Sequence, residues 1–372
     1  MTDTTITEVH TTIVDLPSKR PHRFAATTMS QQSIVAVRVR IAGGLEGVGE
    51  GVTPGGPWWG GESVETIKSV IDRYLAPLLV GHDSRAIGAA VDRMDGFVAA
   101  NPVAKAAVET ALWDLRGKLL GVPVSDLLGG LRRDRIPITW AFSAAPVADL
   151  VDELAEKLEV GHRSFKFKMG AEPAHLDSRR VLEVLERIPD ECAVFVDTNG
   201  RWSEIDAMRW LPVLIEAGVT VVEQPIARWD IAGLANLTRR LTVPVMADET
   251  VASAQQALDL VKAGAVNAFA VKIPKCGGLS RAREVAAVAD GAGLACFGAA
   301  TPETSIMASI SSQLYGTMHD LSLGCELFGP ALLVDEVVEQ PMVFEGADLV
   351  IPTGPGSGVV LDEEKLRKYA RD

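Results

Sequence analysis

The sequence contains few cysteines, and none of them is placed for a zinc or redox motif. Among its 372 residues there are four cysteines, and no two of them form a CxxC pair. They are Cys192, Cys276, Cys296 and Cys325. Sparse cysteines in a long chain suit a reducing compartment, so a cytoplasmic location is expected and disulfides are the less favoured interpretation.

Long apolar runs are missing as well. The longest, residues 291–300, is too short to span a bilayer. The first residues, Met1–Thr4, have neither the basic region nor the apolar stretch of a signal peptide. The sequence therefore predicts a protein that is neither secreted nor embedded in a membrane.

Basic residues are in the minority. Lys and Arg number 36 against 49 Asp and Glu, which gives a net charge of −13. Such a surface repels DNA and anionic lipids, so neither nucleic acid nor a membrane is expected as a partner. A small anionic substrate would need a local positive site, made by lysines or by a metal ion.

The remaining composition is that of a globular enzyme, with 47% apolar and 23% charged residues. The length predicts two domains, or one large barrel with an addition. Residues 1–130 have an α+β pattern in which strands precede helices. The expected strands are 5–15, 33–41 and 46–52, and the expected helices are 63–79, 84–98 and 103–120.

Residues 131–330 alternate short apolar runs with amphipathic stretches. Eight runs are strand candidates, namely 138–143, 164–169, 193–197, 219–224, 243–249, 268–274, 294–299 and 321–328. One strand and one helix per unit favour an α/β fold, a (β/α)8 barrel. An open doubly wound sheet is less favoured, because no Gly-rich phosphate fingerprint follows any strand. Residues 331–372 are expected to return to the N-terminal domain, with a final helix at 362–369.

Two lysines alternate with phenylalanines in the segment Phe165-Lys166-Phe167-Lys168. Because successive strand residues face opposite sides, the two lysines share one face. In a barrel that face would point inward, where an ammonium group is costly to bury without partners. An edge strand with solvated lysines would explain the pattern equally well.

Three acidic residues each end an apolar run: Asp197, Glu223 and Asp248. A single acid at this position is often only the N-cap of the next helix. Three in successive units would converge at one mouth of a barrel and repel one another unless a cation lies among them. Oxygen ligands favour Mg²⁺ or Mn²⁺ over zinc, and none of the six histidines occupies these positions.

Lys272 also ends an apolar run, four units after Lys168 and therefore opposite it in a ring of eight. Two lysines facing each other across a metal could serve opposite faces of one carbon. Close cations lower each other's pKa, toward values useful for proton transfer. A structural role for Lys272, as the partner of Asp248, stays open.

These residues and their flanking sequence resemble the enolase superfamily, in its muconate lactonizing enzyme subgroup. The similarity lies in the segments 166–170, 197–199, 223–225, 247–250 and 272–278, and in Glu326-Leu-Phe-Gly-Pro330 after the eighth strand. It covers nearly the whole chain. It includes an N-terminal capping domain with Val14-Asp15-Leu16-Pro17 and a mobile loop after it.

The resemblance implies a metal site at the mouth of the barrel. Asp197, Glu223 and Asp248 would bind Mg²⁺ or Mn²⁺, and Asn199 and Glu249 would orient these ligands from behind. The metal would hold the substrate carboxylate and stabilise an enolate.

The resemblance also implies the reaction. Lys168 and Lys272 would flank the reacting carbon as acid and base, Lys166 would support Lys168, and Glu326 would help to order the substrate. The implied substrate is a small dicarboxylate, cis,cis-muconate, which forms a lactone through an enolate that a lysine protonates. A homo-oligomer, such as an octamer, is implied in the same way.

Loops of the capping domain would close the mouth and select the substrate. The expected substrate-binding residues are His22, Arg23, Met29, Trp58, Trp59 and Gly298. A dianionic substrate favours a cationic or donor-rich wall, which His22 and Arg23 would provide. The two tryptophans could equally be ordinary packing between the domains.

Two other functions compete with lactonization. Racemisation of N-acylamino acids runs on the same type of site and is the main alternative. Dipeptide epimerisation is disfavoured, because the usual Asp-x-Asp after the eighth strand is replaced by Cys325-Glu326-Leu327. A non-catalytic barrel is the alternative from another class, and the intact set of carboxylates and lysines speaks against it.

Overall fold

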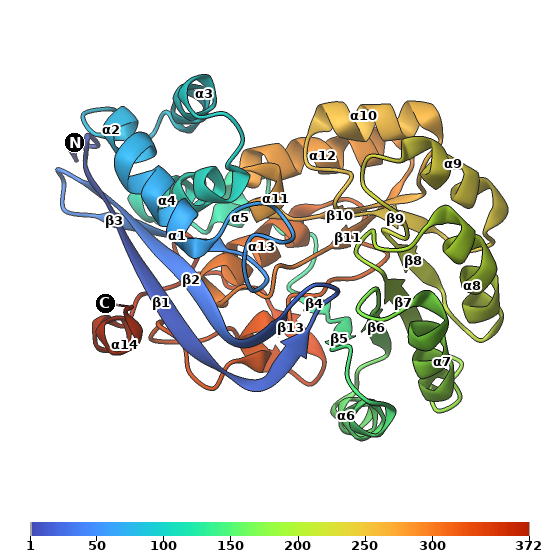
Figure 1. Ribbon diagram of the computed structural model, residues 1–372. Helices are drawn as coiled ribbons and strands as arrows, with labels where there is room; N and C mark the ends of the chain where they lie inside the picture. Colours follow the sequence, from blue (N-terminus) through green and yellow to red (C-terminus); the bar gives the residue numbers. More distant parts are fainter. Residues whose placement is uncertain (1, 372) are drawn as a thin grey trace.

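The computed structural model describes residues 2–371, in which an antiparallel sheet stands beside a barrel of parallel strands (Figure 1). The sheet has the order β1-β2-β3, with β1 (Ile6–Arg23), β2 (Thr28–Ile41) and β3 (Glu46–Val52). The expectation of a loop directly after Pro17 was wrong. The strand continues past a register shift, because the opposite arm of the hairpin offers Met29 and Thr28 as partners for His22 and Arg23.

Helices cover one face of this sheet. They are α1 (Val64–Val70), α2 (Ala76–Leu79), α3 (Ile87–Phe97) and α4 (Pro102–Leu120). The short α5 (Val124–Leu127) follows them and packs against α4 and a later helix, α13 (Ser305–Thr317), instead of the sheet. The single helix expected at 63–79 is interrupted by a π-helical turn, Ile71–Leu75. Alternate residues of β2, Val35, Val37 and Val39, pack against these helices and form the core of the capping domain.

Helix α4 holds the parts of the molecule together. A side chain at Gly49 of β3 would lie 2.0 Å from the backbone of α4, so glycine is needed for this close approach. Buried Asp114 accepts hydrogen bonds from Val48 N in the sheet and Ser357 N in the C-terminal segment, each 2.7 Å long. Buried Glu109 accepts one from Leu279 N (2.8 Å), at the start of barrel helix α12 (Leu279–Ala292).

Seven parallel strands form the barrel wall in chain order. They are β5 (Trp140–Phe142), β6 (Ser164–Lys168), β7 (Ala193–Asp197), β8 (Val221–Glu223), β9 (Val245–Ala247), β10 (Ala268–Val271) and β11 (Ala295–Gly298). The eighth strand expected at 321–328 is reduced to Cys325, whose backbone bridges Gly298 on one side and Ile138 on the other. These two bridges close the ring and confirm the predicted barrel with its capping domain.

Helices surround the strands on the outside (Figure 1). They are α6 (Val147–Val160), α7 (Ala174–Leu185), α8 (Glu204–Glu216), α9 (Ile231–Arg240), α10 (Ala254–Ala263), α12 and α13. The one-turn helix α11 (Ile273–Cys276) directly follows β10 at the mouth of the barrel and packs against α4. Phe165 and Phe167 pack in the layer between strands and helices. Phe195, Met246 and Phe297 fill a separate cluster inside the ring. The period of two thus sends the two phenylalanines of β6 outward and its two lysines inward.

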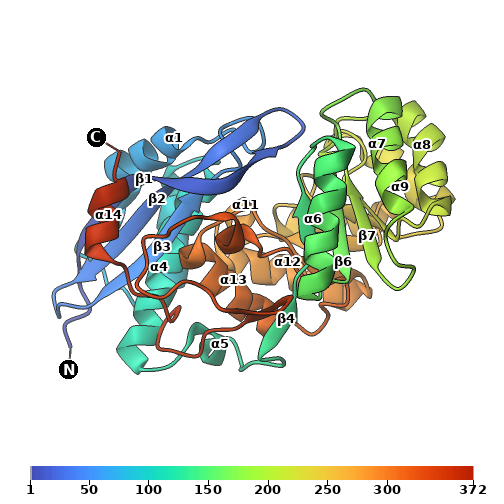
Figure 2. The same ribbon diagram turned by 90° about the horizontal axis from the view of Figure 1, so that it is seen from below.

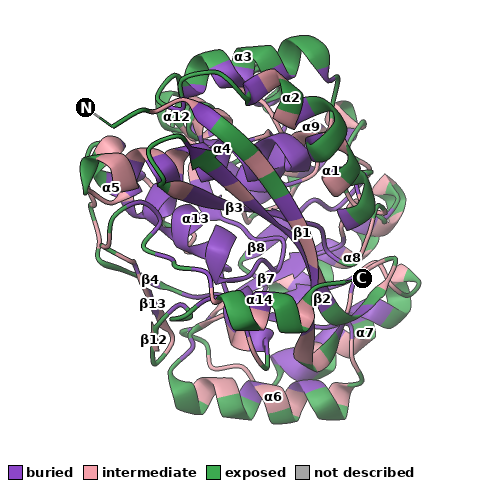
Figure 3. Cartoon of the chain, turned by 90° about the vertical axis from the view of Figure 1, so that its left-hand side faces the viewer, coloured by how far each residue is buried: buried purple, intermediate pink, exposed green. Residues whose placement is uncertain are grey.

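The C-terminal segment runs back to the antiparallel sheet (Figure 2). Its elements are the 3₁₀ turn η2 (Gly329–Leu332), β12 (Phe344–Glu345), β13 (Asp348–Val350) and α14 (Glu363–Tyr369), and β13 pairs with β4 (Arg135–Pro137). Leu333, Val338 and Leu361 pack against Val14 and Ile34. As a result, α4 and α13 are largely buried at the centre of the molecule (Figure 3).

Within residues 2–371, no helix is long and apolar enough to cross a membrane. All four cysteines are buried free thiols.

Candidate active site

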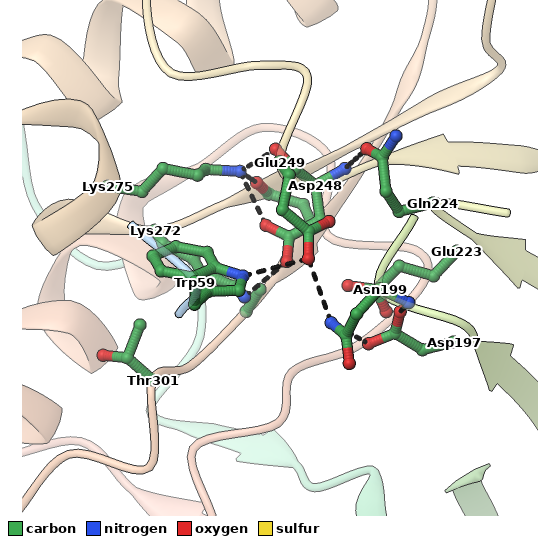
Figure 4. A network of polar contacts seen from close by, with 12 residues as sticks. Trp59, Asp197, Asn199, Glu223, Gln224, Asp248, Glu249, Lys272, Lys275 and Thr301 are labelled. Atoms are coloured by element: carbon green, nitrogen blue, oxygen red, sulfur yellow. Dashed lines mark hydrogen bonds and ion pairs between the residues drawn. The ribbon is translucent and has the colours of Figure 1, made fainter. Parts of the chain in front are cut away.

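Charged side chains gather at the carboxyl ends of neighbouring barrel strands. Lys168 pairs in register with Asp197, and Asp197 with Glu223, on strands β6, β7 and β8. Asp248 directly follows β9, and Lys272 directly follows β10. Because parallel strands end at one mouth, these five side chains, far apart in sequence, gather in one place. Figure 4 shows four of them, Asp197, Glu223, Asp248 and Lys272.

The flanking lysines and carboxylates are paired. Lys168 Nζ lies 2.7 Å from Asp197 Oδ2, and Lys272 Nζ lies 2.7 Å from Asp248 Oδ2. The carboxylate side chains are fully buried, and the lysine side chains are nearly so. The structure therefore contains the Lys272–Asp248 contact that was foreseen as a structural alternative, and places it at the mouth of the barrel beside Lys168.

Lys166 lies deeper inside the ring. Its ammonium nitrogen is 2.5 Å from Glu223 Oε2 and 2.6 Å from Glu326 Oε2, and it is fully buried. It also lies 4.2 Å from the centre of the Phe297 ring. Two carboxylates and an aromatic face thus stabilise a cation that would be prohibitively costly to bury alone.

The expected lowering of the lysine pKa values is not found. Burial disfavours both ammonium groups, but contact with acidic groups, chiefly Asp197 for Lys168 and Asp248 for Lys272, outweighs it. The pKa of each lysine is therefore raised above its usual value. The mutual repulsion of the two lysines is the smaller effect, because each has a carboxylate in direct contact.

The acidic set has the chemistry of a divalent-cation site. It offers oxygen ligands only, and in the described part of the chain the carboxylate of Glu223 has no polar partner besides the Lys166 ammonium at its Oε2, so its Oε1 is left without one. Burial, and the neighbouring Asp197 and Glu326, raise the pKa of Glu223 in spite of Lys166. Among residues 2–371, however, no three His, Cys, Asp or Glu side chains are arranged as a ready metal site. Asp197 and Asp248 instead turn oxygens toward lysines.

Asn199 and Glu249 connect this set to the capping domain. Asn199 Nδ2 donates to Asp197 Oδ2 (3.2 Å) and to Glu249 Oε1 (3.0 Å). The same Glu249 oxygen accepts a hydrogen bond from Trp59 Nε1 (3.0 Å), and the Trp59 ring lies 4.8 Å from Lys272 Nζ. The capping loop therefore contacts both an acidic residue beside Asp248 and the lysine opposite Lys168 (Figure 4).

A cavity of about 20 Å³ lies among these groups. Its lining includes Lys168, Asn199, Lys272 and Glu326 from the barrel, and Trp58 and Trp59 from the capping domain. Phe24, Pro54, Ala300, Thr301, Pro302 and Phe328 complete it. Two capping segments thus cover the mouth, with Phe24 at the tip of the β1–β2 hairpin and Pro54, Trp58 and Trp59 after β3.

Four of the expected substrate-binding residues are not among the described residues that line this cavity. His22 is fully buried, and burial, with the charges of Arg20 and Lys168, holds its pKa well below the usual range. Arg23 turns away and pairs with Glu172 at 2.6 Å. Met29 is buried in the hairpin beside His22. A side chain at Gly298 would lie 2.6 Å from the Tyr315 ring, so this glycine makes room for packing.

Lys275 was missed as part of the site. Its ammonium group donates to Asp248 Oδ1 (2.8 Å) and to the backbone oxygens of Asp248 (2.6 Å) and Ala270 (2.8 Å). A signal was available, because the one-turn helix α11 starts directly after Lys272. A residue three positions on therefore returns to the same side as Lys272.

Comparison with known proteins identifies the family. A family model described as "Enolase C-terminal domain-like" matches residues 149–365. A second, described as "Mandelate racemase / muconate lactonizing enzyme, N-terminal domain", matches residues 6–129. Together the two models span both the capping domain and the barrel.

Individual relatives match over their whole length. The chain is 41% identical to muconate cycloisomerase 1 of Rhodococcus opacus, covering 100% of both chains. The crystal structure of 2-chloromuconate cycloisomerase from Rhodococcus opacus 1CP is 70% identical, with a TM-score of 0.99 over 99% of this chain and 100% of that one. Muconate lactonizing enzyme from Pseudomonas fluorescens, solved with muconolactone, is 39% identical with a TM-score of 0.97 over 99% of this chain and 100% of that one. The chain therefore belongs to the mandelate racemase and muconate lactonizing enzyme family of the enolase superfamily.

Proposed function

We propose that this protein is a cycloisomerase that converts cis,cis-muconates into muconolactones. The observation that carries the proposal is one cavity lined by two lysines, Lys168 and Lys272, which contact Asp197 and Asp248 at the carboxyl ends of barrel strands. The full-length similarity to muconate and chloromuconate cycloisomerases supports the substrate class.

The substrate is a conjugated dicarboxylate, and the cavity carries positive charge for it. Lys168 and Lys272 would face the reacting carbon from opposite sides, and Lys166 would add positive potential from below. Asp197, Glu223 and Asp248 would hold a divalent cation, Mg²⁺ or Mn²⁺. When bound, such a cation withdraws electrons from a substrate carboxylate and lowers the energy of negative charge that develops there.

The reaction forms one carbon–oxygen bond. An oxygen of one carboxylate attacks the far double bond, and the π electrons of that bond move toward the other carboxylate to give an enolate. The ammonium group of Lys168 or Lys272 then donates a proton to the carbon beside that carboxylate. This transfer turns the substrate dianion into a lactone monoanion and leaves the donating lysine neutral, to be reprotonated from solvent. The second lysine stays charged and opposes the negative charge of the enolate.

The capping segments would hold the chain in a ring-like shape. Phe24, Trp58 and Trp59 of the capping domain, together with Phe328 from the end of the barrel, give the cavity an aromatic lining that would limit the entry of water. Bringing the attacking oxygen close to the alkene carbon removes much of the entropic barrier.

Chlorinated muconates are a second candidate substrate class. The observation that favours them is the 70% identity to 2-chloromuconate cycloisomerase, against 41% to muconate cycloisomerase 1. Comparing kcat/KM for 2-chloromuconate and unsubstituted muconate decides between the two classes.

The test is incubation with cis,cis-muconate in deuterated water, followed by nuclear magnetic resonance. We expect loss of the diene and one deuterium in the lactone, on the methylene carbon beside the free carboxylate and on one face only. Absence of lactone from metal-supplemented enzyme contradicts the proposal. Exchange of the α-proton of an N-acylamino acid under the same conditions would support racemisation instead.

A further inference from the structure

A second, larger cavity lies outside the wall of the first. Its volume is about 420 Å³, against about 20 Å³ for the inner cavity. The inner volume has room for about one water molecule, whereas ligand sites usually measure about 300–1,000 Å³. A six-carbon dicarboxylate therefore fits the outer cavity as the structure stands, and fits the inner one only after groups in its wall have moved.

The two cavities share part of their lining. Trp58, Trp59 and Asn199 line both, and Glu249 lines the outer one. The wall between them therefore includes the indole of Trp59, which is held by its hydrogen bond to Glu249. A ligand in the outer cavity would be one side chain away from Lys272, over which the Trp59 ring lies.

Two arginines with free guanidinium groups line the outer cavity. Arg201 follows β7 and Arg228 follows β8, and both are exposed. Neither makes an ion pair or a side-chain hydrogen bond with any residue in the described part of the chain. Of the described residues around this cavity, only Glu249 carries a carboxyl group, and that group already accepts hydrogen bonds from Trp59 and Asn199.

The backbone holds these arginines in place. Trp202, next to Arg201, forms a β-bridge with Ile226, two residues before Arg228. Gly200 N also donates to Gln224 O (2.8 Å). The two loops therefore form one unit at the rim, and Trp229, 79% exposed, adds an aromatic side chain to it.

The two arginines place positive charge on a protein whose overall charge is negative. A net charge of −13 repels a dianion at long range. The outer cavity, with its two arginines and aromatic walls, would instead attract a dianion that comes close to it. Guanidinium groups also match carboxylates in shape and hydrogen bonding.

We propose that the outer cavity is a capture site for six-carbon dicarboxylates, in which Arg201 and Arg228 bind the carboxylates before the ligand passes the Trp59 wall. This inference rests on the proposed function for its substrate class. It assigns to the arginines a role in the rate of association, not in the chemical step.

The experiment measures association separately from turnover. Adipate has two carboxylates and six carbons but no double bond, so it cannot cyclise. Its association rate is followed by stopped-flow tryptophan fluorescence for the wild type, R201Q/R228Q and the matched control R209Q/R239Q. Arg209 and Arg239 are exposed on α8 and α9 and lie outside the lining of either cavity, so both double variants change the net charge equally.

We expect R201Q/R228Q to lower the association rate constant by about three- to tenfold at low ionic strength, and the control to leave it unchanged. The difference should vanish near 1 M salt, where the Debye length is about 3 Å. Equal rates for the two double variants, or no saturable signal with adipate in the wild type, would overturn the inference. Turnover of cis,cis-muconate by the wild type is measured in parallel. If it is absent while association still depends on the arginines, the proposed function fails and the capture site stands.

Discussion

At the scale of single residues, the site is a buried network of paired charges. Lys166, Lys168 and Lys272 each have a carboxylate oxygen within 2.7 Å. Removing one partner leaves a buried charge without compensation, which is generally more damaging than loss of a surface ion pair. Effects on folding must therefore be separated from effects on chemistry in any variant.

The lysines should be indispensable to turnover. Lys168→Ala and Lys272→Ala are each expected to lower kcat by at least about 10²-fold, the usual contribution of a general acid. Lys262→Ala, on the exposed face of α10, should retain wild-type activity and is the control. Circular dichroism checks that the variants fold. A folded variant with near-normal kcat removes that lysine from the reaction.

Binding of a divalent cation by Asp197, Glu223 and Asp248 can be measured without following turnover. In the wild type, added Mn²⁺ should raise the melting temperature, because a ligand that binds only the folded state stabilises it. Glu223→Gln and Asp197→Asn should lose both this shift and the lactonization activity. Chelation should silence the wild type reversibly, and full activity in a chelated, metal-free sample would contradict metal assistance.

The charged residues at the strand ends could be predicted from the sequence, whereas the side chains with which they form ion pairs could not. Asp197, Glu223 and Lys272 follow apolar runs, so the mouth of a barrel could be predicted to gather them. The direction of Arg23 toward Glu172, 149 residues away, depends on tertiary contacts that no local pattern encodes. The raised lysine pKa values depend on the same long-range pairing.

At the scale of elements, the capping loop after β3 reaches into the site through Trp59. The indole N–H donates to Glu249 (3.0 Å), and the ring stacks over Lys272 at 4.8 Å. The position of this loop is thus linked to the position of Lys272, one of the two lysines proposed to take part in the reaction.

Substitutions of Trp59 should separate the effect of its hydrogen bond to Glu249 from the effect of its ring over Lys272. Trp59→Phe keeps a ring over Lys272 but loses the hydrogen bond, and we expect KM to rise about fivefold with a modest fall in kcat. Trp59→Leu loses both contacts and should lower kcat further. The Mn²⁺-induced shift in melting temperature should persist in both. Steady-state kinetics equal to wild type in the leucine variant would show that the loop only packs.

Strands could be predicted where the pattern of apolar residues along the sequence was clear. β3 and β7 have the expected bounds, because alternation or a continuous apolar run ends sharply at each terminus. The prediction of an eighth barrel strand at 321–328 was wrong in its length, because the bridges of Cys325 to its two neighbours close the ring without a longer strand. The prediction of a loop after Pro17 was also wrong. The strand continues there because it pairs with the opposite arm of the hairpin, which the composition of the segment itself does not indicate.

At the scale of the whole molecule, a buried carboxyl group joins the two domains. Glu50 on β3 accepts hydrogen bonds from Thr304 N (3.0 Å), Thr304 Oγ1 (2.6 Å) and Met307 N (2.9 Å) at the start of α13. Burial raises the pKa of Glu50 to about 8, against the lowering effect of these bonds.

This raised pKa predicts how stability depends on pH. Between its usual pKa of 4.5 and about 8, the folded protein keeps a proton on Glu50 that the unfolded chain has released. The free energy of unfolding should therefore fall as pH rises through this window. Glu50→Gln should flatten the fall, measured by urea denaturation from pH 5 to pH 8. Glu339→Gln, at an exposed position, should leave the slope unchanged, and an unaltered slope in Glu50→Gln would contradict the prediction.

The most direct test of the account compares two substrate classes on one enzyme preparation. Cycloisomerisation and racemisation would both use the proposed metal ligands and lysines, so substrate preference distinguishes the two reactions. We predict that kcat/KM for cis,cis-muconate or 2-chloromuconate exceeds that for an N-acylamino acid by at least about 10²-fold, or 2.7 kcal/mol in transition-state stabilisation. A preference for the N-acylamino acid would contradict the assignment and establish the protein as a racemase.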